Sequence, residues 1–398
     1  MRRNAKLLII LFSSLLLLGN TTFADHRKGQ LLKKARYTAI SKLPEKLVST
    51  ARKEKLLGKA LFFDENLSEP AGQSCASCHS PKFAFTDPDK QPAVSAGAHP
   101  DRFVSRNSPT VMYSRFTPPL HFDEEEGLWI GGLFLDGRAA TLEDQAKLPF
   151  LGAMEMANPD AETVVNKVNR AAYAPLFKAL YGEDIFDTGE AAFDKIAQAI
   201  AAFERTQQFS PFRSKYDYFL AGIITLSAQE QLGLEIFEAE EKGNCAACHP
   251  AQASDNGQAP LFTDFSYDNI GIAKNANNPF LSQDREFNPE GENFVDIGLG
   301  ATVEDPAENG KFRVPTLRNV GITGPYMHNG IFTTLKEVVE FYNTRDTDKR
   351  WGEAEVPSTV NHDELGALQL SEEEVDALVA FLETLTDGYH PGKSRPGM

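Results

Sequence analysis

The residues with the clearest chemistry in this chain are its cysteines, because all four fall in two copies of the pattern C-x-x-C-H. The copies are Cys75, Cys78 and His79, and Cys245, Cys248 and His249. Chance would give one such pattern with a likelihood on the order of 10⁻³, and two far less. The spacing suits covalent haem c, because two thiols can add across the haem vinyl groups while the adjacent imidazole ligates the iron. The sequence therefore predicts two covalently bound haem c groups.

Zinc and disulfides are the competing interpretations of the same cysteines. Zinc-binding cysteine pairs usually lie about 15–20 residues apart, whereas these pairs begin at Cys75 and Cys245, 170 residues apart, with a histidine behind each. In an oxidising compartment a free C-x-x-C pair tends to become a disulfide unless another group claims its thiols. Attachment of two haem groups would use all four thiols, so we expect no disulfide.

The N-terminal segment predicts export. Arg2, Arg3 and Lys6 precede an apolar run over residues 7–18, and a small-residue ending follows at 22–24, which is the layout of a bacterial secretory signal peptide. The run is short for a membrane span, and an uncleaved anchor is the alternative. We expect a periplasmic protein whose mature chain has no membrane span.

The charge balance limits the kind of partner. The chain has 40 basic and 56 acidic residues, a net charge of −16. Removing residues 1–24 takes away three basic and no acidic residues, which leaves −19. This balance argues against a nucleic-acid-binding protein, which needs a basic face. It suggests a protein partner with a basic docking face and association that weakens with salt.

The elements that must position the two motifs are predicted to be helices. Residues 57–62 and 232–237 repeat the pattern Leu-Gly-x-x-Leu/Ile-Phe before the two motifs. We predict a mainly α fold with two tandem cytochrome-c-like haem domains and long irregular loops. The expected division is a signal peptide at 1–24, an N-terminal arm at 25–50, a first haem domain at 51–210 and a second haem domain at 211–398.

Helical periodicity is clearest in segments 192–208, 227–237, 334–342 and 371–385. The last three open with a capping box, in which Ser or Thr is followed three residues later by Glu. Clear alternating strands are missing. Residues 250–312, rich in Asn, Gly, Pro and Asp, predict a long irregular loop, and loops of that length are usually functional or mobile.

Whether such a protein carries electrons or performs chemistry depends on the sixth position of each iron. The candidates are the methionines, a tyrosine and the remaining histidines. These histidines are His26, His99, His121, His328, His362 and His390. The residue types alone do not choose among them.

Six further runs of sequence carry a family resemblance. They are Arg106–Thr110, Leu135–Ala139, Leu142–Ala146, Glu155–Met156, Phe312–Val320 and Gly324–Gly330. With both C-x-x-C-H motifs in register, they resemble the bacterial di-haem cytochrome c peroxidase/MauG family over residues 50 to 385. The resemblance implies a peroxide-reacting haem at His79 and an electron-transfer haem at His249.

The resemblance also implies roles for single residues. His99 matches the distal histidine that caps the first haem in resting peroxidases, Glu155 the distal carboxylate and Gln145 the amide near it. A carboxyl group can shuttle the proton that peroxide cleavage needs. We expect the apolar neighbours at 150–156 to raise the pKa of Glu155 if they enclose it.

A calcium ion is a further implication of the resemblance. The side chain of Asn107 and the backbone carbonyls of Thr323 and Pro325 match the family's calcium ligands between the haems. Oxygen donors of this kind suit a hard cation, which independently makes calcium plausible.

Tyr342 distinguishes two branches of the family. It follows Leu335, Val338 and Val339 at helical spacing, so it lies on the apolar face of the predicted helix, where a core tyrosine is the plain interpretation. In the family this position supplies the sixth ligand of the second haem, which is methionine in ordinary cytochrome c peroxidases and tyrosine in MauG. The resemblance therefore favours the MauG-like branch, with Met327 as the rival ligand.

Two positions depart from the family pattern. Leu135 stands where the family has a tryptophan between the haems, so electron exchange would either use another route, with Trp129 as a candidate after a local rearrangement, or proceed more slowly. Gly243 stands where MauG has a surface tryptophan that oxidises its protein substrate. This second departure puts the maturation of methylamine dehydrogenase in doubt.

The sequence thus predicts an enzyme, an exported di-haem peroxidase that reacts with hydrogen peroxide and oxidises a protein partner, with side-chain modification as the MauG-like outcome. An ordinary cytochrome c peroxidase, reduced by a small cytochrome or cupredoxin, is the alternative. A passive di-haem electron carrier and a zinc-binding structural protein are alternatives of other classes.

Overall fold

The structure is a computed structural model that describes residues 23–89, 91–254 and 257–391. Residues 1–22 of the predicted signal peptide lie outside these described residues. The helices are α2 (Phe23–Ser41), α3 (Thr50–Phe62), α4 (Cys75–Cys78), α5 (Leu142–Leu151), α6 (Ala161–Arg170), α7 (Ala174–Tyr181), α8 (Gly189–Glu204), α9 (Lys215–Leu220), α10 (Ala228–Glu238), α11 (Leu299–Val303), α12 (Leu335–Thr344) and α13 (Glu372–Glu383). The prediction of a mainly α fold is confirmed.

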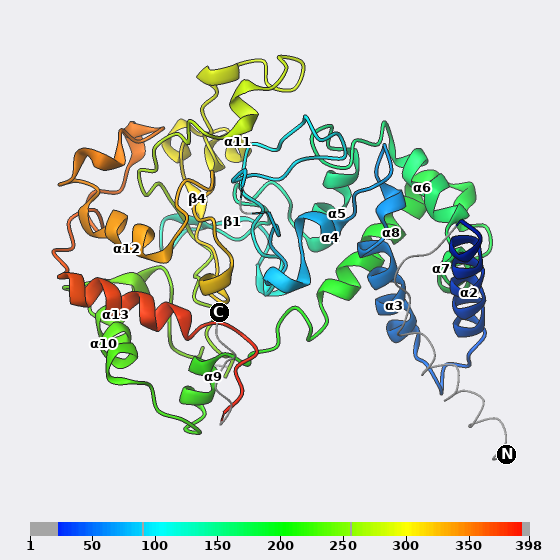
Figure 1. The fold of residues 1–398 in the computed structure, drawn as a ribbon, viewed down its shortest axis with the longest axis horizontal. Coiled ribbons are helices and arrows are strands. Elements are labelled where there is room, and N and C mark those ends of the chain that lie inside the picture. The colour runs from blue at the N-terminus through cyan, green and yellow to red at the C-terminus, as the bar shows by residue number, and fades with distance from the viewer. Residues whose placement is uncertain (1–22, 90, 255–256, 392–398) are drawn as a thin grey trace.

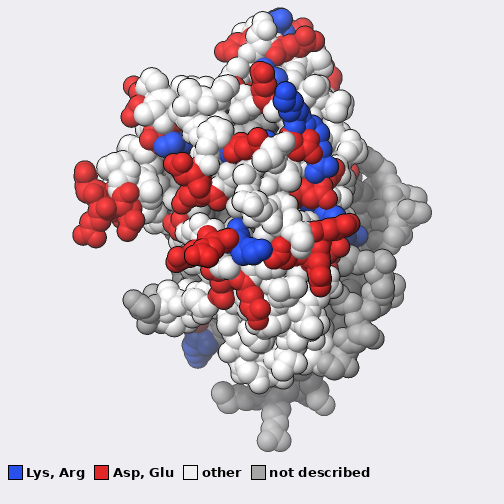
Figure 2. Space-filling model, turned by 90° about the vertical axis from the view of Figure 1, so that its left-hand side faces the viewer, with Lys and Arg blue, Asp and Glu red and all other residues white. Residues whose placement is uncertain are grey.

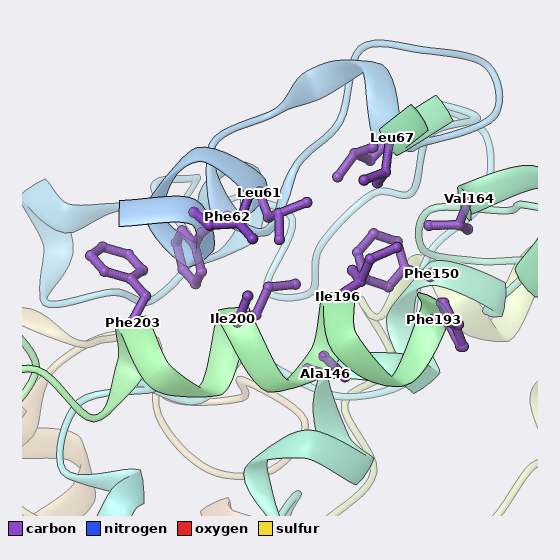
Figure 3. Close-up of a cluster of buried hydrophobic side chains, with 14 of the residues drawn as sticks. Leu61, Phe62, Leu67, Ala146, Phe150, Val164, Phe193, Ile196, Ile200 and Phe203 are labelled. Atoms are coloured by element: carbon purple, nitrogen blue, oxygen red, sulfur yellow. The ribbon is translucent and has the colours of Figure 1, made fainter. Parts of the chain in front are cut away.

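The first hydrophobic core lies among helices α3, α5, α6, α7 and α8, at the right in Figure 1. Phe62 of α3 contacts Phe203 of α8 and Phe209, which follows α8, with ring centroids 5.6 and 5.9 Å apart. Ile196 and Ile200 extend the same face of α8, as Figure 3 shows. These side chains are buried because α8 presents its apolar stripe to α3 and α5.

The second core repeats this helix packing with α10 and α13, at the left in Figure 1. Phe237 and Phe381 are fully buried there, with ring centroids 5.0 Å apart. Tyr216 begins this core in the sequence, whereas Phe209 is the last fully buried member of the first core. The predicted boundary after residue 210 falls between them and stays a prediction.

A glycine permits the close helix contact in each core. A Cβ added to Gly58 in α3 would overlap the carbonyl oxygen of Ala199 in α8. A Cβ added to Gly233 in α10 would overlap the carbonyl oxygen of Ala377 in α13 in the same way. The repeated Leu-Gly-x-x-Leu/Ile-Phe pattern therefore encodes a repeated helix crossing.

The three predicted capping boxes are confirmed. Ser227 caps α10, Thr334 caps α12 and Ser371 caps α13, and in each case the glutamate three residues later returns a bond to the cap backbone. Each pair satisfies backbone donors that the first turn of a helix leaves unpaired. The start of α12 is thereby fixed, which sets the position of Tyr342 within it.

The strands of the described residues are short and form two antiparallel pairs. They are β1 (His121–Asp123) with β2 (Leu128–Ile130), and β3 (Tyr267–Asp268) with β4 (Phe312–Arg313). Residues 250–312, predicted as a long irregular loop, contain β3, α11 and several single 3₁₀ turns. Tyr267 of this segment pairs with Arg313, so the segment folds back towards the centre of the molecule.

The predicted N-terminal arm is a helix packed on the first core. Tyr37 of α2 meets Tyr173, which precedes α7, with ring centroids 6.0 Å apart, and Ile40 packs against the same cluster. The arm is therefore docked rather than solvated, although Leu31 and Leu32 remain exposed. In the part of the chain that the structure describes, no helix combines the length and apolar character needed to cross a bilayer.

Candidate functional site

Each C-x-x-C-H motif lines a cavity of its own. The first cavity is lined by the motif at 75–79 and has a volume of about 420 Å³. The second cavity is lined by the motif at 245–249 and has a volume of about 320 Å³. Both volumes lie within the range of about 300–1,000 Å³ that is common for ligand sites.

The motif histidines are oriented by backbone carbonyls. Nδ1 of His79 lies 3.0 Å from the carbonyl oxygen of Phe85, and Nδ1 of His249 lies 2.8 Å from that of Phe262. Burial lowers the pKa of both histidines, which favours the neutral imidazole. With Nδ1 donating its proton to a carbonyl, Nε2 keeps the lone pair that an iron ligand needs.

The turns that supply these carbonyls are a repeat that the sequence analysis missed. Phe85 and Phe262 both have positive φ angles, of 57° and 55°, and each is followed by Thr and Asp. The hydroxyl of Thr110 donates to the carbonyl of Ala84, and that of Thr316 to the carbonyl of Leu261, both at 2.5 Å. The repeated Phe-Thr-Asp and Pro-Thr runs were the available signal.

The motif cysteines also fit haem attachment. All four are free thiols. Burial raises the pKa of Cys78, Cys245 and Cys248 to about 12, so these thiols are neutral. Apolar side chains such as Phe62 and Ile200 complete the wall of the first cavity. Each cavity therefore offers two thiols, one oriented imidazole and an apolar wall, which is the donor set of a haem c site.

Glu155 and Gln145 line the first cavity together with His79. Gln145 lies in α5, and Glu155 lies in the turn after α5, where its amide donates to the carbonyl of Gly152 at 2.9 Å. Burial raises the pKa of Glu155, and the charge of Arg138 partly opposes this. A carboxyl group and an amide thus face the space beside the motif histidine.

The expected enclosure of Glu155 is only partly correct. Phe150, Met154 and Met156 line the first cavity as expected. Leu151 and Ala153 are exposed, because they lie on the outer side of the turn that follows α5. The side chains that face the cavity, Phe150, Met154 and Met156, therefore account for the raised pKa of Glu155.

His99 is near Glu155 but is not among the residues that line the first cavity. The amide of the preceding residue, Ala98, donates to the carbonyl of Glu155 at 2.7 Å, so the two loops are joined through their backbones. The structure therefore brings Glu155 and Gln145 together and leaves the side chain of His99 outside.

Glu204 and Gln73 are buried polar residues of the first cavity that the sequence analysis missed. Glu204 is 5% exposed and Gln73 is 8% exposed. Within the described residues, Oε2 of Glu204 and Oε1 of Gln73 have no hydrogen-bond partner. Burial raises the pKa of Glu204 to about 8. A glutamate at the end of a helix such as α8 is usually exposed, so the sequence does not indicate that Glu204 is buried.

Tyr342 and Met327 both line the second cavity with His249. Burial raises the pKa of Tyr342, and the nearby Cys245 adds to this. Among the described residues, the hydroxyl of Tyr342 has no hydrogen-bond partner, unlike that of Tyr326, which donates to the carbonyl of Val320 at 2.9 Å. The free hydroxyl of Tyr342 makes it a suitable ligand.

The three residues expected to bind calcium lie together at the second cavity. Nδ2 of Asn107 donates to the carbonyl oxygen of Pro325 at 2.6 Å, and Thr323 lines the same cavity. Turning the amide over would direct its oxygen to this point. The donor set is neutral, which suits calcium only together with further oxygen ligands such as water.

The wall between the cavities contains Leu135 and Arg313, each of which lines both. Trp129 lines neither cavity; it packs instead on Phe122, with ring centroids 5.5 Å apart. A route through Trp129 would therefore need a local rearrangement and stays a prediction. A side chain six residues away in the sequence is held outside by the β1–β2 pair.

The sequence comparisons match this arrangement of two cavities. Residues 52–224 match the family model described as di-haem cytochrome c peroxidase, and residues 231–386 match the model described as cytochrome c. The fold and site thus define an oxidoreductase with two haem c groups. The chain belongs to the di-haem cytochrome c peroxidase/MauG family, as the resemblance implied.

Individual relatives agree with this family. The chain is 42% identical over 349 residues to the methylamine utilization protein MauG of Paracoccus denitrificans (strain Pd 1222), covering 83% of this chain and 88% of the relative. It is 32% identical over 337 residues to the cytochrome c551 peroxidase of Nitrosomonas europaea, covering 83% and 79%. The crystal structure of the diheme peroxidase BthA from Burkholderia thailandensis E264 superimposes with a TM-score of 0.75 at 34% identity, over 84% and 86% of the two chains.

Proposed function

We propose that this protein is an exported di-haem c-type peroxidase that reacts with hydrogen peroxide in the first cavity and oxidises a protein partner through the second haem. The observation that carries this proposal is the presence of Glu155 and Gln145 in the cavity of His79. A carrier of electrons needs no carboxyl group there. Similarity to both MauG and cytochrome c peroxidases supports the first part of this proposal, the reaction with peroxide.

The chain's own residues can move the protons of this reaction. When bound, haem c supplies an iron that can bind and reduce peroxide. The carboxylate of Glu155 would take the proton from the inner peroxide oxygen and deliver it to the outer oxygen, which leaves as water. Gln145 would hold the peroxide by hydrogen bonding. His99, from its loop beside Glu155, would close the first cavity in the resting protein.

Replacing the carboxyl group tests the proposal. We expect Glu155→Gln to slow the reaction with peroxide by about 10²–10⁴-fold, the usual contribution of one proton-transfer group. Glu162→Gln, at an exposed position of α6, is the matched control. Loss of the reaction in Glu155→Gln with both haems attached would exclude the passive electron carrier, whereas an unchanged rate would overturn the role of Glu155.

Tyr342 favours a MauG-like second haem over an ordinary cytochrome c peroxidase. A phenolate ligand stabilises oxidised iron more than a thioether does, and axial ligands can move haem potentials over about 0.8 V. His249 and Tyr342 would hold this haem, and the phenolate of Tyr342 would favour its oxidised state and so the oxidation of a protein side chain. Rapid multi-turnover peroxide reduction with a reduced small cytochrome or cupredoxin would instead support the ordinary peroxidase.

A basic partner would suit the end of the molecule formed by α10, α12 and α13. Figure 2 shows acidic residues gathered on this end with basic residues among them, and Lys336 and Arg350 pair there with Asp376 and Glu340. Among the exposed acidic residues of α10 and α13 are Glu235, Glu238, Glu372 and Glu373. Charge complementarity of this kind accelerates encounter at low salt. A rate of electron transfer to a basic partner that is independent of ionic strength would exclude this docking face.

Calcium would join the two halves at Asn107, Thr323 and Pro325. The proximity of the Asn107 amide to the Pro325 carbonyl supports this proposal. Treatment with a chelator should change the haem absorption spectrum, and added calcium should restore it. Metal analysis that finds no calcium in the purified holoprotein would exclude the site.

The proposal of export is based on the predicted signal peptide at residues 1–24. N-terminal sequencing of the protein recovered from the periplasm should begin at Asp25. A chain that still begins at Met1 would indicate the uncleaved anchor.

A further inference from the structure

Arg313 is half-buried on the wall of both cavities and has no acidic partner among the described residues. Its Nε donates to the carbonyl of Phe134 at 3.2 Å, and its backbone amide donates to the carbonyl of Leu135 at 2.8 Å. Across the described ranges, no carboxylate forms an ion pair with its guanidinium. Burial lowers the pKa of Arg313, and the phenol of Tyr267 is the group among the described residues that opposes this.

Two other arginines with little exposed surface are paired with carboxylates. Arg106 forms ion pairs with Asp136 at 2.7 Å and Asp296 at 2.6 Å. Arg318, whose side chain is fully buried, pairs with Asp217 at 2.9 Å. An unpaired charge in a protein interior is costly, so buried charges are normally paired. No carboxylate of the described residues pairs with Arg313, so its charge is available to an anion bound in the cavities that it lines.

The position of Arg313 identifies the kind of anion. It lies in β4 and lines both the first and the second cavity. A haem brings two propionate carboxylates into its cavity, and a guanidinium presents five N–H donors in a planar fork that matches carboxylates. We propose that Arg313 binds propionate carboxylates of both haems at the wall between the two cavities. The proposal rests on haem binding in these cavities and is independent of peroxide chemistry.

Such a cation affects the reduction of both haems. Reduction adds an electron, so a fixed positive charge nearby favours the reduced form. The same charge keeps the propionates ionised, because an opposite charge lowers a carboxyl pKa. Without the cation the propionate pKa rises, and reduction of the haems becomes coupled to proton uptake.

The experiment is a spectroelectrochemical titration of the holoprotein. For Arg313→Gln we expect the reduction equilibrium of both haems to fall about tenfold, which is about 59 mV for one electron, and to become pH-dependent. Arg350→Gln, which removes an exposed arginine, should titrate like the wild type. Unchanged potentials in Arg313→Gln with both haems attached would overturn the proposal. A shift of one haem only would overturn the shared binding.

A second variant covers the case in which Arg313→Gln does not fold. Arg313→Lys keeps the charge but loses the planar fork, so the propionate bending band in resonance Raman spectra should shift while the potentials stay near those of the wild type. An unshifted band would overturn the proposal. Wild-type potentials that change between chloride and phosphate at constant ionic strength would also overturn it, because Arg313 would then bind an anion from solution.

Discussion

Gly58 of α3 packs directly against the backbone of Ala199 in α8, with no room for a Cβ between them. Gly233 and Ala377 make the same contact in the second core. We expect Gly58→Ala and Gly233→Ala to lower the free energy of unfolding by at least about 1–3 kcal/mol, because inserted atoms must push two backbones apart. Thermal unfolding of the holoproteins measures this.

Gly189→Ala is the control for these two variants. Gly189 starts α8, and an added Cβ would meet nothing within 4 Å. Alanine there should be neutral or stabilising by up to about 1 kcal/mol. Equal effects at Gly189 and Gly58 would mean that helix propensity, and not the helix contact, is responsible.

The buried carboxyl of Glu204 predicts a pH dependence of stability. Its pKa is raised from 4.5 to about 8 by burial. Between these values the folded protein holds a proton that the unfolded chain releases, so the free energy of unfolding falls as pH rises, by up to about 1.4 kcal/mol per pH unit. Glu204→Gln should remove this slope in melting temperatures recorded from pH 5 to pH 8.

The control for this slope is Glu373→Gln, at an exposed position of α13. It should keep the wild-type dependence on pH. If the curves of Glu204→Gln and the wild type run parallel, Glu204 is ionised in the folded protein and its carboxylate has a partner beyond the described residues.

Tyr342 and Met327 are the two candidate ligands that line the second cavity. We expect Tyr342→Phe to convert this haem from six-coordinate to five-coordinate, visible as a high-spin signal by electron paramagnetic resonance. Met327→Leu should leave the spectrum unchanged. Tyr326→Phe removes another hydroxyl from the same cavity and is the matched control. The reverse result for Tyr342 and Met327 would assign the ligand to methionine.

Leu135 gives the wall between the cavities an aliphatic side chain. Leu135→Trp would place an oxidisable ring there, and we expect faster redistribution of electrons between the haems after partial reduction. The larger side chain should cost about 1–3 kcal/mol of stability. Leu135→Met, which changes the volume little, should leave the rate as it is. Equal rates in the tryptophan variant and the wild type would mean that Leu135 does not limit exchange.

The sequence carried the parts of this site that depend on local patterns. The C-x-x-C-H motifs and the capping box before Tyr342 act through neighbours a few residues away, and the Leu-Gly-x-x-Leu/Ile-Phe pattern is readable because it occurs twice, although its glycines contact distant helices. The carbonyl groups that orient the two histidines do not lie at a constant spacing from them, so no single pattern predicts them. Phe85 lies six residues after His79, whereas Phe262 lies thirteen residues after His249.

Other features depend on contacts that no local pattern encodes. Trp129 is near Leu135 in the sequence, but the pairing of β1 with β2 keeps it out of the wall between the cavities. Glu204 has the spacing of an ordinary helix-end glutamate, and only tertiary packing makes it buried. The surroundings of Trp129 and Glu204 are formed by segments that are distant in the sequence and meet only in the folded protein.

The wall shared by the two cavities is built from both halves of the chain, which are synthesised at different times. Arg313, from the C-terminal half, lines the first cavity, and Asn107 to Thr110, from the N-terminal half, line the second. The first cavity therefore cannot close until about three quarters of the chain has been synthesised. A nascent chain would leave its first pair of thiols open throughout that time, and a fragment ending near residue 210 would remain incomplete.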